Sequence, residues 1–337
     1  QMVLSWIAAF LLISITASQE LTHFPEHFVV VRRNENSVTL PCDSAIAGPV
    51  TWKMNDEDLD FDYFYEQKDQ NLSVKEVDTP LLGEYSCWRG ETKLSSTLLL
   101  QETEEGEDID ALLTCHAVSY DCSFNCTWTD SRYKMVRLGV GPECSEGQTS
   151  CQWVSKYRQT ENEKLTFELS HNISPYAEEN TTLEVTAEAI DNPFLLRRTK
   201  VFYLREIVVP ESPEIVSSQV VGQKLNVTIK PPSSWSTPHS FFSLEHEIEY
   251  VYRDDGRAER SLSSLIPKKI SKLRARSRDP LVFSSWSQWT HWKNVRKSCR
   301  CKKKTKSELP SQCLEHCKKK KGQRRRKKAK KSPNPGK

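Results

Sequence analysis

The chain of 337 residues contains little glycine and few long hydrophobic runs. Glycine totals 11, and we find no Gly-rich dinucleotide turn, P-loop, nucleophile elbow or H-E-x-x-H metalloprotease motif. Beyond the opening segment no stretch is apolar over even 12 residues, which is too short to cross a bilayer. We therefore predict that the protein is not an enzyme, uses no cofactor or resident metal, and has no membrane span.

The opening segment, residues 1–18, is predicted to be a secretory signal peptide. Residues 3–15 form an apolar run, and the small residues Thr16, Ala17 and Ser18 suit cleavage before Gln19. Eleven cysteines fit an oxidising compartment, and their odd number leaves at least one unpaired or bonded to another chain. Five N-x-[ST] sequons predict glycosylation at Asn71, Asn125, Asn172, Asn180 and Asn226. Together these features predict a secreted, extracellular glycoprotein.

Charge is distributed very unevenly along the chain. Residues 293–337 carry 20 Lys or Arg and two acidic residues, so subtracting this +18 from the total of +3 leaves −15 on residues 1–292. The basic tail, 299–337, contains four cysteines and His316, but their spacing suits no common zinc finger. Because a secreted chain does not meet nucleic acid, we favour a cell-surface polyanion such as heparan sulfate as its ligand. The alternative is a solvated tail without a dedicated partner.

Residues 19–101 have the spacing of an immunoglobulin-like domain. Trp52 follows Cys42 by ten residues, and Tyr85 precedes Cys87 by two. This is the pattern of an inter-sheet disulfide, a Trp packed against it and a tyrosine corner. Leu81 stands where an Asp is usual, so the local salt bridge of that pattern is not expected.

Two further domains are predicted at residues 107–210 and 211–298. An acidic segment, 101–110, precedes the first, and the proline-containing sequence PESP at 210–213 separates the two. Short segments with period-two alternation predict strands in both, and Cys115 and Cys126 flank a turn at a spacing that suits a bridge between neighbouring strands. We therefore expect an all-β protein: an immunoglobulin-like sandwich followed by two fibronectin type III-like sandwiches.

The third domain ends in a pattern of alternating arginines followed by tryptophans three residues apart. Alternation places the arginines on one face of a strand, and three-residue spacing in an extended run places the indoles on one side. Guanidinium groups stack on indole faces, each contact contributing about 0.5–2 kcal/mol. The ladder predicted from this pattern contains Arg274, Arg276, Arg278, Trp286, Ser287 and Trp289.

The sequence WSQWT at 286–290 resembles the W-S-x-W-S box of the class I cytokine receptor family, with Thr290 in place of the final Ser. Residues 235–244 (WSTPHSFFSL) and 177–179 (AEE) are similar to the beta-subunit family shared by interleukin-12 and interleukin-23. The resemblance covers roughly residues 20–295. It implies a soluble receptor-like subunit that is secreted as a heterodimer with a four-helix cytokine alpha subunit, and the pair then engages a cell-surface cytokine receptor.

The same resemblance implies a binding site at the bend between the second and third domains. In the family an acidic and aromatic pocket there receives an arginine of the helical partner. The matching positions are Tyr120, Glu178, Phe241 and Asp279, with Phe241 standing where the family often has Tyr. Asp279 also lies directly after the arginine ladder, so the alternative is a local ion pair with Arg278.

The cysteines depart from the family pattern. Ser174 stands where the family carries the cysteine that bonds to the helical partner. Cys122, Cys144 and Cys151 are extra or displaced, and we pair Cys144 with Cys151. This leaves Cys122 as the spare thiol that could form an inter-chain bond.

Two other functions remain open at this point. A soluble cytokine receptor alpha chain or decoy would have the same three domains, and a matrix-bound adhesion protein would act through its tail without a helical partner. The sequence also leaves open whether the chain forms homodimers.

Overall fold

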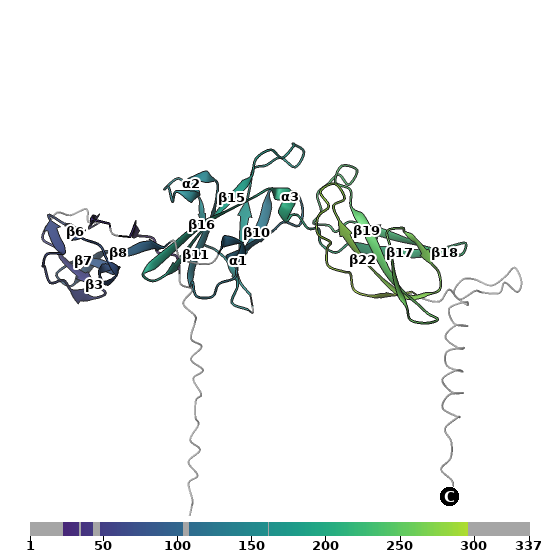
Figure 1. Cartoon of the computed structure of the whole chain (residues 1–337), viewed down its shortest axis with the longest axis horizontal. Helices are drawn as coiled ribbons and strands as arrows, with labels where there is room; N and C mark the ends of the chain where they lie inside the picture. Colours follow the sequence, from purple (N-terminus) through teal and green to yellow (C-terminus); the bar gives the residue numbers. More distant parts are fainter. Residues whose placement is uncertain (1–22, 34, 43–47, 104–107, 161, 296–337) are drawn as a thin grey trace, which may run out of the picture. The chain divides into compact units, whose positions relative to one another are not determined.

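The computed structural model describes residues 23–33, 35–42, 48–103, 108–160 and 162–295 (Figure 1). Within these ranges the chain is almost entirely β-structure, with three α-helical segments of one turn each. The strands form several sheets packed as sandwiches, and the predicted all-β fold class is confirmed. The chain divides into two compact units, and the first contains the described residues up to Glu211 together with Ser233–Ser243 and Asp279–Ser285.

The immunoglobulin-like part is built from eight strands. They are β1 (Phe28–Val31), β2 (Ser37–Leu40), β3 (Thr51–Met54), β4 (Glu57–Asp58), β5 (Tyr65–Lys68), β6 (Asn71–Lys75), β7 (Gly83–Arg89) and β8 (Thr92–Thr103). One sheet has the order β2-β6-β5, and β4, β3, β7, β8 and β1 belong to the other. In β6 the buried Leu72 and Val74 alternate with more exposed polar residues, as expected for a strand with one face toward a core.

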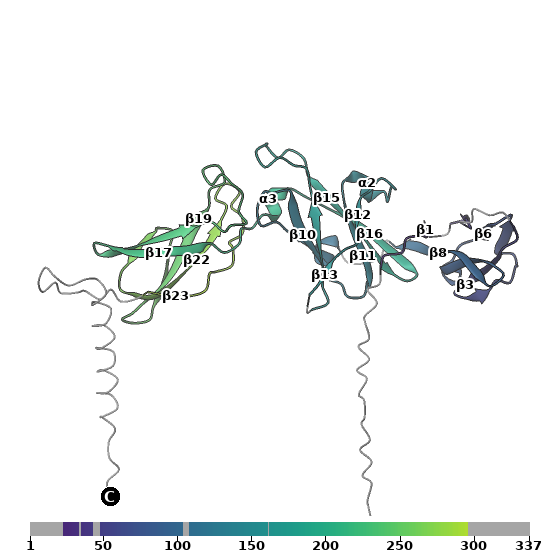
Figure 2. The same cartoon turned by 180° about the vertical axis from the view of Figure 1, so that it is seen from behind.

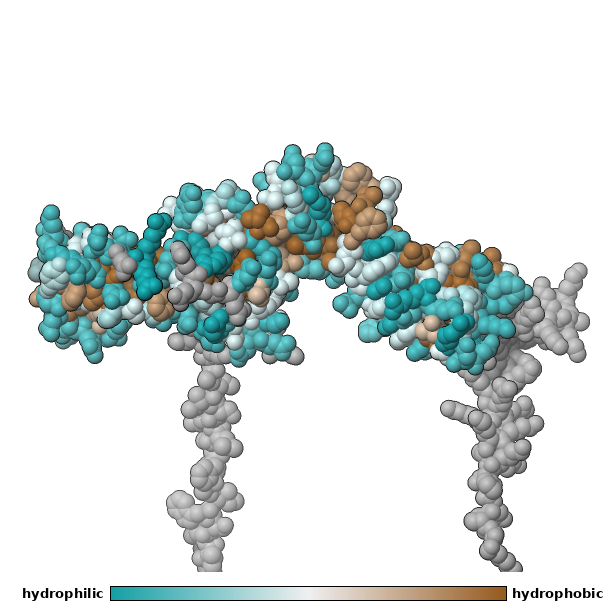
Figure 3. Space-filling model, in the orientation of Figure 1, coloured by the Kyte–Doolittle hydropathy of each residue, from teal (hydrophilic) through white to brown (hydrophobic). Residues whose placement is uncertain are grey.

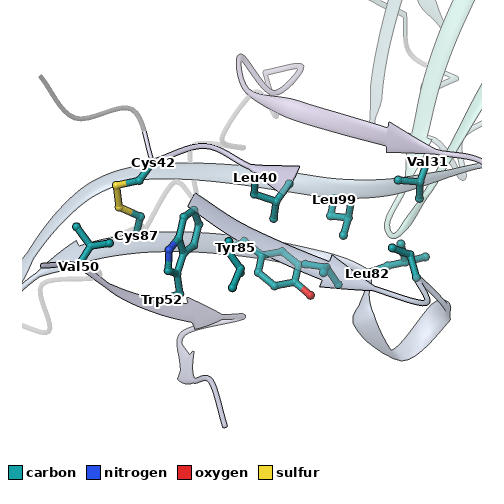
Figure 4. Packing of buried hydrophobic residues seen from close by; sticks show 12 residues of the cluster. Val31, Leu40, Cys42, Val50, Trp52, Leu82, Tyr85, Cys87 and Leu99 are labelled. Atoms are coloured by element: carbon teal, nitrogen blue, oxygen red, sulfur yellow. A yellow bond between two sulfur atoms is a disulfide. The ribbon is translucent and has the colours of Figure 1, made fainter. Parts of the chain in front are cut away.

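The core of this part follows the spacing seen in the sequence (Figure 4). A disulfide joins Cys42 to Cys87, and Trp52 lies beside it between the sheets. The Tyr85 hydroxyl donates a hydrogen bond of 2.7 Å to the carbonyl of Leu81, which is the contact of a tyrosine corner. The Tyr85 side chain is fully buried in this core.

The second sandwich follows directly and belongs to the same compact unit (Figures 1 and 2). Its elements are α1 (Ile109–Leu112), β9 (Leu113–His116), β10 (Ser123–Trp128), β11 (Met135–Val140), α2 (Pro142–Ser145), β12 (Trp153–Val154), β13 (Arg158–Gln159), β14 (Leu165–Ser170), β15 (Leu183–Asp191), β16 (Phe194–Phe202) and α3 (Leu204–Ile207). One sheet has the order β13-β14-β10-β9 and the other β12-β11-β15-β16. Disulfides join Cys115 to Cys126 and Cys144 to Cys151.

Strand β8 connects the two sandwiches of this unit by backbone hydrogen bonding. It continues to Thr103, beyond the predicted domain end at 101, and its last residues pair in parallel with β16. The register places Phe194 opposite Gln101 and Leu196 opposite Thr103. A single nine-stranded sheet therefore runs from the immunoglobulin-like part into the second sandwich.

The second compact unit contains the remaining strands. They are β17 (Glu214–Val221), β18 (Lys224–Lys230), β19 (Glu245–Tyr252), β20 (Ala258–Ser261), β21 (Leu265–Pro267), β22 (Ile270–Arg278) and β23 (Lys293–Asn294). A sheet β17-β18-β21 faces a sheet β20-β19-β22-β23, as in a fibronectin type III-like sandwich. Ile248, Ile270 and Leu273 lie in its core.

Two loops beyond residue 211 belong to the first unit. Residues 233–243 and 279–285 cluster with the second sandwich and not with the strands that flank them in sequence. The predicted boundary at 210/211 remains a prediction, but these two loops are what position the candidate site.

Candidate partner-binding site

Tyr120 lies at the centre of a site formed by four loops of the first unit: 119–122, 171–179, 235–242 and 279–284 (the four-loop site). Its backbone N–H donates to Ser236 Oγ at 3.0 Å, and its hydroxyl donates to Asp279 Oδ2 at 2.9 Å. Its ring stacks on Phe242 at 5.8 Å and meets Trp235 edge-on at 5.8 Å. Burial, together with the nearby charge of Asp279, raises the pKa of the Tyr120 hydroxyl, so it remains a donor at any physiological pH.

Asp279 is 4% exposed, so the structure places this predicted partner-binding carboxylate inside the four-loop site. Its Oδ1 accepts the backbone N–H of Leu281 at 2.8 Å. Its own N–H donates to Ser284 Oγ at 3.0 Å, which closes the loop 279–284 on itself. Arg278 pairs with Glu245 at 2.6 Å, so the ion pair between Arg278 and Asp279 considered from sequence is not the arrangement observed.

The loop 279–284 presents two large apolar side chains to solvent. Leu281 is 75% exposed and Phe283 is 73% exposed. Phe283 has a φ of 50°, a left-handed conformation that is costly for a bulky residue. A strained backbone persists only where the surrounding structure holds it in place. Such residues are found most often at functional sites.

Aromatic residues of two other loops meet beside Tyr120. Phe241 is 54% exposed, and its ring lies 5.5 Å from Tyr176 and 4.8 Å from the buried Phe242. The Tyr176 hydroxyl donates to the carbonyl of Thr237 at 3.1 Å, which ties the loop 171–179 to the loop 235–242. Tyr176 was missed from the sequence, although it directly precedes the AEE run used in the resemblance.

The two glutamates of that run have different environments. Glu178, the predicted site residue, is exposed. Glu179 is half-buried, accepts the backbone N–H of Leu204 at the start of α3, and forms an ion pair with Arg205 at 3.2 Å. Glu179 therefore has a structural role, whereas Glu178 is available to a partner.

The loop 119–122 ends in an exposed cysteine. Among the described residues Cys122 is the free cysteine, since the other six are in disulfides. Its carbonyl accepts the N–H of His171 at 3.0 Å, and the neighbouring Asp121 accepts from Ser236 Oγ at 3.1 Å. These hydrogen bonds hold Cys122 at the edge of the four-loop site.

The second unit contains a stacked Arg–Trp ladder. The guanidinium of Arg276 lies over Trp286 at 4.7 Å and over Trp289 at 4.5 Å. Arg278 lies over Trp286 at 4.6 Å, and Arg274 over Trp289 at 4.6 Å. The structure therefore brings together the arginines and tryptophans that the sequence pattern placed on matching faces.

The ladder is longer than the sequence analysis proposed. Trp292 adds a further rung over Arg274 at 4.5 Å, and its three-residue spacing from Trp289 was a signal that could have found it. A row of glutamates on β19 pairs with the arginines of β22: Glu249 with Arg274, Glu247 with Arg276 and Glu245 with Arg278. Each guanidinium is thus both ion-paired and stacked, which joins β22 to β19 on one side and to the tryptophans on the other.

The hydroxyls of the WSQWT box join its backbone to β22. Ser287 is buried; its N–H donates to the carbonyl of Ser277 at 2.8 Å, and its Oγ accepts the N–H of Ser277 at 3.0 Å. Thr290 makes the same two contacts with Ala275, at 2.8 and 3.0 Å. A threonine hydroxyl serves here as a serine hydroxyl would, which explains why this departure from the box is tolerated.

The sequons differ in their surroundings. Asn71, Asn172, Asn180 and Asn226 are exposed. Asn125 is half-buried in the middle of β10, which pairs with a strand on each side, and its Oδ1 is buried without a hydrogen-bond partner. Asn125 is therefore the least accessible of the five predicted acceptors.

Within the ranges that the structure describes, no group of three or more His, Cys, Asp or Glu side chains is arranged to hold a metal ion. In the same ranges no helix is both long and apolar enough to cross a membrane. The basic tail, with its four cysteines and His316, lies outside the described residues, so its predicted polyanion binding stays a prediction.

The sandwiches and the Arg–Trp ladder agree with the resemblance to class I cytokine receptors noted in the sequence. A family model described as "Cytokine interleukin-12p40 C-terminus" matches residues 110–191. The interleukin-12 subunit beta of Marmota monax is 28% identical over 282 residues, which are 75% of this chain and 84% of that protein. The protein of the same name from Ovis aries is 28% identical over 327 residues (86% and 97%), and that from Homo sapiens 26% over 283 residues (75% and 84%). The chain is a homologue of the interleukin-12 beta subunits, and these relatives are cytokine subunits.

Proposed function

We propose that this chain is a secreted cytokine subunit that binds a four-helix cytokine subunit through the four-loop site, forming a heterodimer that engages a cell-surface cytokine receptor. The observation that carries the proposal is the exposure of Tyr176, Phe241, Leu281 and Phe283 on loops of one compact unit. Large apolar side chains held in water by fixed loops are typical of interaction sites. The relatives' name, interleukin-12 subunit beta, supports a subunit that acts in a complex.

Asp279 is buried, so a partner can reach its carboxylate only where the existing hydrogen bonds leave an oxygen lone pair available. Its carboxylate already accepts from Tyr120 and from the N–H of Leu281, but a carboxylate offers about four lone-pair sites. An arginine of the partner would therefore add to the existing hydrogen bonds at a nearly dry position, where a charged pair is strong. Glu178, exposed beside Tyr176, would attract the same arginine from the rim.

The apolar residues are proposed to supply most of the affinity. Aromatic and aliphatic anchors that become fully enclosed dominate many interfaces, while exposed rim charges contribute little. Phe241 stands where the family often has Tyr, so a hydroxyl is lost while the apolar contact area is kept.

The test is co-expression with candidate four-helix subunits followed by affinity capture. Phe241→Ser and the double substitution Leu281→Ser with Phe283→Ser should each weaken capture by about 1–2 kcal/mol, roughly tenfold in affinity. Phe61→Ser is a matched control, because Phe61 is 53% exposed in the immunoglobulin-like part. Equal losses in all three variants, or no loss in any, would contradict the four-loop site.

The tail is proposed to have a separate role in retaining the protein on heparan sulfate. The support is the charge of +18 on residues 293–337, beside an acidic body that sulfated chains would repel. A soluble receptor alpha chain or decoy remains the second candidate for the four-loop site. It would bind a helical cytokine reversibly after secretion and would not need co-expression.

A further inference from the structure

The outer face of the sheet β17-β18-β21 in the second unit carries a sequon at its centre. Leu225 and Val227 of β18 point into the core, and Asn226 between them is exposed. The register places Asn226 directly opposite Gln219 of β17 and Leu265 of β21, so these three side chains share the outer face. Because β18 is paired on both sides, its backbone holds Asn226 in a fixed position.

Two large apolar side chains lie beside this asparagine. Leu265 is 42% exposed, and Leu262, just before β21, is 58% exposed. Asn226 and Leu262 line the same hollow of about 540 Å³ at the side of β18. Val221 of β17, which pairs with Lys224 of β18, is exposed as well. Figure 3 shows hydrophobic residues at the surface over β17 and β18. The exposed leucines beside the sequon are apolar surface that a group attached to Asn226 could shield from water.

We propose that Asn226 carries an N-linked oligosaccharide whose first sugars lie over Leu262 and Leu265, so that carbohydrate and not a protein partner covers this face. The bond forms between Asn226 Nδ2 and the anomeric carbon of an N-acetylglucosamine. The sugar comes from a lipid pyrophosphate-linked oligosaccharide; its bond to the pyrophosphate oxygen breaks, the lipid pyrophosphate leaves, and the amide nitrogen loses one proton. The inference rests on the export that the proposed function requires.

Carbohydrate fits this face better than protein does. A sugar ring packs its C–H groups on apolar side chains and keeps its hydroxyls in water, so it covers the leucines and solubilises the surface. A bulky group on the central strand also blocks the flat approach that a protein surface would need. Asn125 lies on a central strand too, but its buried Oδ1 and half-buried side chain leave no comparable access.

The first measurement is site occupancy. The full chain is secreted from cultured animal cells, and glycopeptides are identified by mass spectrometry before and after enzymatic removal of N-glycans. We expect Asn226 to be occupied. Occupancy at Asn71, Asn172 or Asn180 with an unmodified Asn226 overturns this inference alone. A chain that is secreted without modification at any sequon also overturns this inference alone, whereas a chain that stays inside the cells unmodified overturns export, and with it both the inference and the proposed function.

The second measurement tests the cover. Asn226→Gln should lengthen retention on a hydrophobic-interaction column and raise the self-associated fraction at least about twofold, because Leu262 and Leu265 become accessible. Asn71→Gln, which removes a sequon from the immunoglobulin-like part, is the matched control and should change neither. Adding Leu262→Thr and Leu265→Thr to Asn226→Gln should restore normal retention. If Asn226→Gln behaves like the control, or if the two threonines restore nothing, the glycan does not cover this face.

Discussion

The hydroxyl of Tyr120 donates a hydrogen bond of 2.9 Å to Oδ2 of Asp279, a residue 159 positions further along the chain. The bond joins the loop 119–122 of the second sandwich to the loop 279–284, which follows the arginine ladder in sequence. A hydrogen bond to a charged acceptor contributes about 1.5–3 kcal/mol, more than a bond between neutral groups. The two loops are therefore fixed against one another before any partner arrives.

Asp279→Ala should weaken capture of the helical partner by about 2 kcal/mol or more, because a buried charge partner is removed and Tyr120 and Leu281 lose their acceptor. Because Asp279 is buried, the substitution should also cause a modest loss of stability. Tyr120→Phe separates the two effects, since it keeps the carboxylate and removes one donor. Capture and melting temperature are measured together, with the exposed Asp60→Ala as control. If capture survives in Asp279→Ala while stability falls, Asp279 only supports the fold.

Arg276→Lys should lower the free energy of unfolding of the second unit by about 1–3 kcal/mol. A lysine keeps the charge but cannot stack flat between Trp286 and Trp289 while pairing with Glu247. Thermal unfolding and the amount of secreted protein are the measurements. Arg257→Lys, on an exposed arginine, is the matched control and should have little effect. A similar melting temperature for both variants would show that the ladder contributes little.

Acidification should loosen the loop that begins at His171. The Nδ1 of His171 accepts the N–H of Ile173 at 3.2 Å and its Nε2 lies 3.1 Å from the carbonyl of Asp121, which fits a neutral ring. Burial lowers the pKa of His171 below its ordinary value of about 6.5. The unfolded chain therefore binds this proton first, and stability falls as the pH drops from about 6.5 toward the lowered value.

Denaturation midpoints at pH 7.5 and 5.5 are the measurement for this prediction, with about 6.5 marking the upper end of the sensitive window. His171→Gln should reduce the difference between the two midpoints. Part of the pH dependence should persist, because burial also lowers the pKa of His246 in the second unit. His291→Gln, on an exposed position, should leave the difference unchanged. An undiminished difference in His171→Gln would show that another group carries it.

Any covalent link between this chain and its partner should depend on Cys122. It is exposed at the edge of the four-loop site, whereas Cys144 and Cys151 are bonded to each other and buried. Cys122→Ser should still co-purify with the helical subunit under native conditions, because the loop contacts hold it. Non-reducing gels should then lack any disulfide-linked heterodimer, while Ser123→Ala retains it. A linked species that persists in Cys122→Ser would assign the bond to another cysteine.

Truncation of the basic tail should lower the salt concentration that elutes the protein from heparin, without affecting partner capture. A cut after Thr290 would be unsuitable, since it removes Trp292 and strand β23. Lys293 donates to the carbonyl of Ile215 at 2.6 Å, and Val295 donates to Ser271 at 2.9 Å. The cut is therefore placed after Val295. Elution at the same salt concentration would exclude the tail as a polyanion-binding segment.

Most features that the sequence predicted correctly depend on the spacing of residues close together in the chain. Alternation placed Arg274, Arg276 and Arg278 on one face because a strand has a period of two, and the Cys42–Trp52–Cys87 spacing indicated its sandwich for a similar reason. The environment of Asp279 could not be predicted, because it depends on loops far apart in sequence packing together. The parallel pairing of β8 with β16 is also a long-range contact, and no local pattern in Gln101–Thr103 predicts it.

The extension of β8 into the second sandwich bears on how fragments of this protein can be prepared. A fragment beginning at residue 107 would lack Gln101–Thr103, so the outer backbone groups of β16 at Phe194–Leu196 would lose their partners. Unpaired strand edges recruit other strands and promote aggregation. The first two sandwiches are therefore best produced as one piece. A mechanical load applied to the immunoglobulin-like part would reach the second sandwich as shear along this short parallel ladder and through the hydrophobic cluster of Phe24, Leu100, Ile190 and Leu195 beside it.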